Sequence, residues 1–188
     1  MKKHMCLKPR GCLMIEHRLI ERAIEILTVE RDRLKAGGTL DPVFIDKMVD
    51  FIRTYADRTH HGKEEDILFE SLESKDLSPE EKSLMRELID EHRYGRELTQ
   101  RLVTAKDAVL EGDKAQLAKL LDAVNKLVEF YPEHIRKEDE RFFPDTERHY
   151  DKAELDAMLR EFYDFDMQMI HEKYRKTVEG IEEEKESV

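Results

Sequence analysis

The sequence predicts an all-α protein, and three observations support that class. Only seven glycines and five prolines interrupt the 188 residues. Glu, Lys, Leu and Arg, which favour helices, are abundant. Apolar residues recur at spacings of three, four and seven, as they do on the buried face of a helix, and no segment shows the alternation typical of a strand. The length fits one domain.

Helix start and stop signals divide the chain into five helical segments. Gly37 and Gly38 end the first segment, and Asp41-Pro42 provides a cap and a first-turn proline for the second. The third opens at Ser78 with a capping-box pattern. The connections are short, so successive helices should pack antiparallel. The predicted segments cover approximately residues 13–36, 41–72, 78–112, 114–143 and 152–184.

Two prolines fall in the fourth segment. We expect Pro132 to kink or divide this helix and Pro144 to end it. The chain is accordingly divided into an N-terminal arm (1–12), a four-helix bundle (13–148) and a fifth helix with its tail (149–188).

The charge balance excludes several classes of function. The formal net charge is -11, whereas nucleic-acid binding requires a basic face, and anionic membranes would repel this surface. No run of 18 apolar residues predicts a membrane span, and no secretory h-region follows the N-terminus. We therefore expect a cytoplasmic protein. Cys6 and Cys12 match no zinc motif, and we expect two unremarkable thiols in a flexible arm.

Four of the eight histidines lie on the apolar seams of four different predicted helices. Three of them have a glutamate four residues later, on the same helix face, and two of those pairs, His60 with Glu64 and His134 with Glu138, align as a weak repeat. Two carboxylates in a core are costly unless a positive charge lies between them. A pair of metal ions supplies that charge, and imidazole with carboxylate suits iron, manganese or zinc. The candidate metal ligands are His17, His60, Glu64, His92, His134 and Glu138.

Other residues near these seams leave alternatives open. His61 and Glu65 are also four apart, but they share a polar face, so we expect them at the surface or in a supporting role. On this reading His61→Ala would keep its metal. Glu21 could orient His17 by a hydrogen bond. Tyr55, Tyr94 and Tyr131 could reach a bound oxygen species, although such tyrosines more often direct the hydroxyl outward. A purely structural bundle with buried histidines is a further alternative.

The motifs resemble those of the hemerythrin-like, or HHE cation-binding, family. The matching segments are 15–17, 60–69, 90–92 and 134–144. The resemblance implies an up-down-up-down four-helix bundle, here with an additional C-terminal helix. It also implies two iron ions with an oxo or hydroxo bridge, with Glu64 and Glu138 bridging the irons and the histidines capping them.

The chain departs from the oxygen-carrying members of that family. Arg96 stands where they have a second histidine on the third helix, and Asp139 stands at the offset of their fourth-helix aspartate, as an alternative to Glu138. A ligand-poorer iron would favour reaction over reversible oxygen carriage. A ferritin-like site is excluded, because that class needs Glu-x-x-His, and Tyr131 stands three residues before His134.

These observations predict a di-iron protein that binds or reacts with O2, peroxide or NO, in sensing or detoxification. The alternative is an iron-storage or iron-dependent regulatory module that acts through a protein partner. We expect the fifth helix to pack across the bundle, or to form a homodimer or partner contact.

Overall fold

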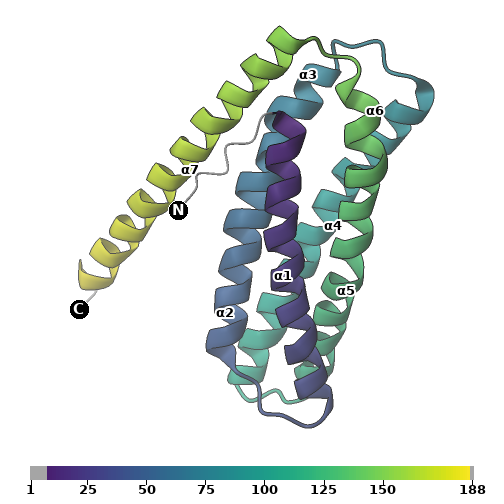
Figure 1. Cartoon of the computed structure of the whole chain (residues 1–188). Helices are drawn as coiled ribbons and strands as arrows, with labels where there is room; N and C mark the ends of the chain where they lie inside the picture. The colour runs from purple at the N-terminus through teal and green to yellow at the C-terminus, as the bar shows by residue number, and fades with distance from the viewer. Residues whose placement is uncertain (1–7, 187–188) are drawn as a thin grey trace.

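The computed structural model describes residues 8–186, and in that part of the chain every regular element is helical. Four antiparallel columns form a bundle, and a fifth helix leaves it at one end (Figure 1), so the predicted fold class is confirmed. The first column is α1 (Pro9–Lys35), and the third is α4 (Pro79–Leu110). The second column consists of α2 (Pro42–Phe51), the π-helices η1 (Ile52–His61) and η2 (Glu64–Phe69), and α3 (Glu70–Leu72). The fourth consists of α5 (Gln116–Lys137), the π-helix η3 (Glu138–Phe142) and α6 (Phe143–Glu147). The fifth helix is α7 (Lys152–Glu186).

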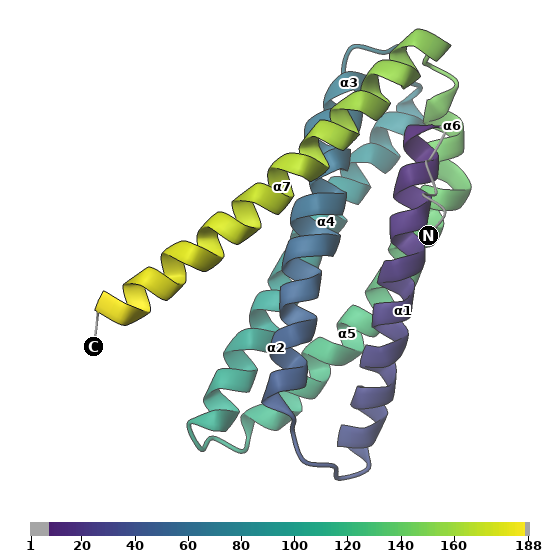
Figure 2. The ribbon, with the colours of Figure 1, turned by 60° about the vertical axis from the view of Figure 1, so that its left-hand side comes forward.

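The columns form a ring in which each packs against two neighbours. α1 packs against α5 and η1, and α4 packs against α5, η1 and α2. α7 contacts α1, η1 and η2, so it covers the edge between the first two columns before it diverges from the bundle (Figure 2). No helix in residues 8–186 combines the length and apolar character needed to span a membrane.

Two helix ends near prolines differ from the prediction. α1 begins at Pro9, earlier than the predicted Leu13, because a first-turn proline needs no partner for its missing N–H. α5 passes Pro132 without division. The fourth column continues past Pro144 to Glu147, so the predicted stop is wrong; Pro144 lies in the first turn of α6, where it is tolerated.

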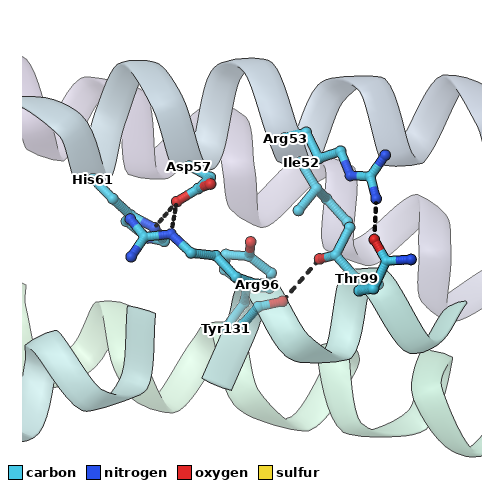
Figure 3. A pocket seen from close by; sticks show the side chains of 9 residues that line it. Ile52, Arg53, Asp57, His61, Arg96, Thr99 and Tyr131 are labelled. Carbon is cyan, nitrogen blue, oxygen red and sulfur yellow. Dashed lines mark hydrogen bonds and ion pairs between the residues drawn. The ribbon is translucent and has the colours of Figure 1, made fainter. Parts of the chain in front are cut away.

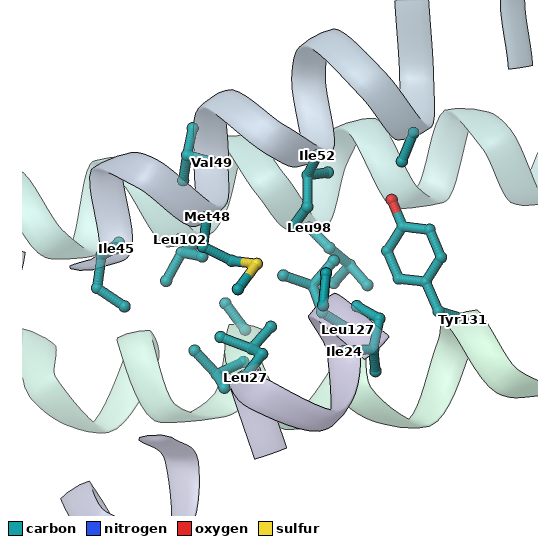
Figure 4. Packing of buried hydrophobic residues seen from close by; sticks show 14 of the residues in the cluster. Ile24, Leu27, Ile45, Met48, Val49, Ile52, Leu98, Leu102, Leu127 and Tyr131 are labelled. Atoms are coloured by element: carbon teal, nitrogen blue, oxygen red, sulfur yellow. The ribbon is translucent and has the colours of Figure 1, made fainter. Parts of the chain in front are cut away.

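Two apolar clusters fill the bundle. The larger one takes residues from all four columns, including Leu27 and Leu102 (Figure 4). The second includes Leu88 and, from α7, Phe162. Cys12 is buried in the second cluster rather than lying in a flexible arm, and Cys6 lies outside the described residues.

The capping box predicted at the start of α4 is present. Ser78 Oγ accepts from the Glu81 amide at 3.2 Å, and Glu81 Oε2 accepts from the Ser78 amide at 2.7 Å. His149 and Arg148 lie 2.9 and 3.0 Å from Glu81 Oε1. Burial works against ionisation, but the hydrogen bonds from Ser78 and His149 lower the pKa of Glu81 to about 2.

We expect Glu81→Gln to lower the free energy of unfolding by about 1 kcal/mol at pH 7. A depressed carboxylate pKa contributes stability above the unfolded value of 4.5, and that stability is lost as the pH falls through about 2. The difference between variant and wild type should therefore shrink between these two pH values. Urea unfolding measures it, with the exposed Glu80→Gln as the control. A difference that stays constant over this range would contradict the linkage.

Candidate metal centre

A layer of polar side chains separates the two apolar clusters. On α1, His17 lies between Leu13 of one cluster and Ile20 of the other. The six candidate ligands named from the sequence are each at most 1% exposed, and the fold brings them together with His61. We call this set the polar layer: His17, His60, His61, Glu64, His92, His134 and Glu138.

The polar layer divides into two groups of potential metal ligands. Within each group, one ligand atom from every residue lies within 4.8 Å of the others. The Nε2 atoms of His17 and His60 lie only 2.8 Å apart. The first group is His17, His60, Glu64 and Glu138, and the second is His61, His92 and His134.

The expectation that His61 lies at the surface is wrong. Its side chain is 2% exposed, and its ring stacks on that of His92 with the centroids 3.9 Å apart. The physical reason is the π-helical backbone of η1, in which a wider turn reduces the rotation between neighbouring residues, so that His60 and His61 both face inward. His61 gives the second group a third imidazole alongside His134. The presence of Arg96 in place of a histidine had indicated a group with fewer ligands, but His61 supplies the additional imidazole.

The two buried glutamates each face both groups. Glu64 places Oε1 3.4 Å from His60 Nε2 and Oε2 3.4 Å from His92 Nε2. Glu138 places Oε2 3.2 Å from His17 Nε2 and Oε1 3.3 Å from His134 Nε2. A carboxylate with one oxygen toward each of two ligand groups has the arrangement needed to bridge two cations.

The layer fits cations because its polar atoms lack partners. Neither oxygen of Glu64 or Glu138 accepts a hydrogen bond, nor do Nε2 of His92 and His134 form one, although all are buried. Buried polar groups are rarely left in this state. Burial and repulsion from Glu138 raise the pKa of Glu64. Against the effect of burial, His134 and His17 lower the pKa of Glu138. Without a cation, the two carboxyl groups thus resist being ionised together.

Each of the four histidines predicted from the sequence turns Nε2 toward the centre and holds a carboxylate at Nδ1. Histidines that bind metals commonly have their second nitrogen held in this way. We call these acids the orienting carboxylates. The pairs are His17 with Asp139 at 2.7 Å, His60 with Glu16 at 2.8 Å, His92 with Glu65 at 2.7 Å and His134 with Glu91 at 2.9 Å.

The orienting carboxylates run around the bundle in a closed circle. Each one contacts the histidine of the next column: Glu16 of α1 contacts the histidine of η1, and Glu65 of η2 contacts that of α4. Glu91 of α4 contacts the histidine of α5, and Asp139 of η3 contacts that of α1. Each is adjacent in sequence to a residue of the polar layer, so its side chain points sideways toward the next column. This adjacency was a usable sequence signal, and the sequence reasoning missed Glu16 and Glu91.

Two of the alternatives left open by the sequence concern α1 and η3. Asp139 binds His17 Nδ1, whereas Glu138 occupies the layer itself. Glu21, weighed as the partner of His17, instead pairs with Arg18 at 3.1 Å.

Each orienting carboxylate also accepts from a basic side chain. Three of the four cations are partly exposed at the surface, and Lys63 alone among them is fully buried. The pairs are Glu16 with Lys63, Glu65 with Arg96, Glu91 with Lys137 and Asp139 with Arg18.

A pocket of about 210 Å³ borders the layer at His61 (Figure 3). Arg96 Nε donates to Asp57 at 2.7 Å, and Asp57 Oδ1 lies 3.5 Å from His61 Nδ1. Tyr131, which is 2% exposed, also lines this pocket. Of the other tyrosines considered, Tyr94 is 38% exposed. Arg96 therefore holds two carboxylates, Asp57 and Glu65, that face the layer, at the position where the sequence departs from the oxygen carriers.

The fold and the site define a four-helix bundle with a buried histidine and glutamate centre suited to metal ions. The model of the hemerythrin HHE cation-binding domain matches residues 12–145, which is most of the chain, and the protein belongs to that family. Comparisons with curated proteins and with solved structures gave no significant match.

Proposed function

We propose that the polar layer binds two iron ions and that the pair reacts with O2, peroxide or NO. The proposal is carried by one observation: Glu64 and Glu138 each direct one oxygen to each histidine group. In the first group the nitrogen ligands would be His17 and His60; in the second they would be His61, His92 and His134. A di-iron pair bound here would supply the redox chemistry.

The residues of the chain would fix the geometry and control access. The orienting carboxylates hold each imidazole with Nε2 directed inward. The apolar clusters on both sides exclude bulk water from the layer. A small molecule that entered the pocket of Figure 3 would lie against His61, and the hydroxyl of Tyr131 could donate a hydrogen bond to it. The first group has fewer imidazoles than the second, so a metal held there would keep more positions for an exogenous ligand, whereas the pocket lies on the side of the second group.

Metal content tests the proposal. After anaerobic reconstitution with ferrous iron, elemental analysis should give about two irons per chain, as bridging carboxylates in a bundle require. When the iron-loaded protein is mixed with O2, hydrogen peroxide or NO, its visible absorption spectrum should change. A chain that takes up no iron, zinc or manganese would sink the metal site. A chain that holds iron but reacts with none of the three would sink the redox function alone.

A further inference from the structure

The ammonium group of Lys63, three residues after His60, is fully buried. Lys63 is 0% exposed, and its Nζ donates to Glu16 and, at 2.7 Å, to Asp166 Oδ1 of α7. A buried ammonium is costly unless paired, so both carboxylates are needed to hold it there. The ring of Phe162, also from α7, lies 5.8 Å from the same Nζ. The side chain of Lys63 is thus enclosed by the fifth helix.

Glu16 connects this lysine to the polar layer. One carboxylate oxygen of Glu16 binds Lys63, and the other lies 2.8 Å from His60 Nδ1. The result is a continuous series of polar contacts from the layer to α7, in the order His60, Glu16, Lys63, Asp166. Among the side chains that the structure describes, the other three orienting carboxylates pair with Arg96, Lys137 and Arg18, and none of these series of contacts reaches α7.

α7 also touches the backbone between the ligands. A Cβ atom added at Gly62 would lie 2.7 Å from Phe165 Cζ, so the aromatic ring packs against the glycine itself. Gly62 immediately follows His61 and precedes Glu64 by two residues. The helix in question diverges from the bundle beyond this region (Figure 2). One face of α7 therefore packs against the segment that carries His60, His61 and Glu64.

We infer that Asp166 and Lys63 are positioning residues for the metal centre, and that docking of α7 and metal binding strengthen each other. The inference rests on the proposed metal function. His60 can present Nε2 to a metal only while Glu16 holds its Nδ1, and Lys63 fixes Glu16 only while Asp166 shares its charge. Coupling between two binding events is reciprocal, so metal should also tighten the docking of α7. A partner that pulls α7 away would weaken metal binding.

The full-length chain with Asp166→Asn tests this, using Co²⁺ as a metal whose visible spectrum reports ligand geometry. Removing a group that orients a metal ligand typically weakens affinity by about 10- to 100-fold, and Asp166 acts through two intermediates, so we expect a loss of about three- to tenfold in competition with a chelator. Hydrogen exchange should show that Co²⁺ protects residues 155–170 in the wild type and protects them less in the variant. Asp166 is 38% exposed at its side chain, so the fold should tolerate asparagine.

Two controls separate this coupling from a general charge effect. Asp164→Asn makes the same change at an exposed position of α7. Glu87→Gln removes the second carboxylate from Lys137, the lysine that serves Glu91, without touching α7. Neither should alter the Co²⁺ protection of α7. Phe165→Ala, which loosens α7 without changing a charge, should weaken Co²⁺ affinity in the same direction as Asp166→Asn.

The outcomes are distinguishable. Equal Co²⁺ affinity and spectrum in the wild type, Asp166→Asn and Phe165→Ala, with no effect of Co²⁺ on exchange in α7, would overturn the coupling and leave the metal site standing. A wild-type chain that binds no Co²⁺ or iron would overturn both.

Discussion

Glu64→Gln is expected to remove most of the bound metal and, at the same time, to stabilise the metal-free chain. Glu64 is 0% exposed and its oxygens accept no hydrogen bond, while burial and Glu138 raise its pKa. A neutral amide of the same shape relieves that repulsion, but it cannot bridge two cations. Replacing a buried carboxyl group that resists ionisation by a neutral amide should raise the free energy of unfolding of the metal-free form by about 1–3 kcal/mol.

Elemental analysis after reconstitution and urea unfolding of the metal-free form measure the two effects. Metal content should fall from about two ions to less than one per chain, since a bridging carboxylate serves both sites. Glu70→Gln, the same change at an exposed position of α3, should alter neither quantity. If Glu64→Gln behaved like Glu70→Gln, the glutamate would be an ordinary buried residue rather than a bridging ligand.

His61→Ala should weaken metal binding by more than about 100-fold, since removing a ligand should cost more than removing a group that only orients one. This reverses the expectation drawn from the sequence, because the ring of His61 is buried against His92 rather than exposed. Bound metal stabilises only the folded state. A 100-fold loss of affinity under conditions where the wild type is saturated should therefore cost up to about 2.7 kcal/mol of stability.

Thermal unfolding with and without Co²⁺ gives this second quantity. The matched control is His149→Ala, because His149 contacts Glu81 at the start of α4, away from the polar layer. The metal-dependent rise in Tm should survive in His149→Ala and be largely lost in His61→Ala. An undiminished rise in His61→Ala would show that only the four histidines on the predicted seams act as ligands.

The helices and the main inward-facing residues followed from local chemistry. The Ser78 capping box and the glycines after α1 set helix ends through groups only a few residues apart. Periodic spacing placed His17, His60, His92 and His134 on buried faces, because an α-helix rotates its side chains by a constant angle. The glutamates four residues after two of these histidines shared their faces for the same reason.

Periodicity failed where the backbone left the α-helical repeat. The π-helical turns of η1 change the rotation between neighbours, and this brought His61 inward beside His60. No local signal in the sequence marked that change. The fifth imidazole of the layer therefore emerged only in the folded bundle.

The sequence by itself determined the all-α bundle, its columns and six of the residues in the polar layer, because each depends on spacing along one helix. The tertiary structure decided which carboxylate holds which histidine. Glu16 lies next to His17 in the chain but serves His60, since a residue beside an inward-facing position points at the neighbouring column. Packing between columns likewise placed α7 over Lys63, a contact joining residues about 100 positions apart that no helical repeat could encode.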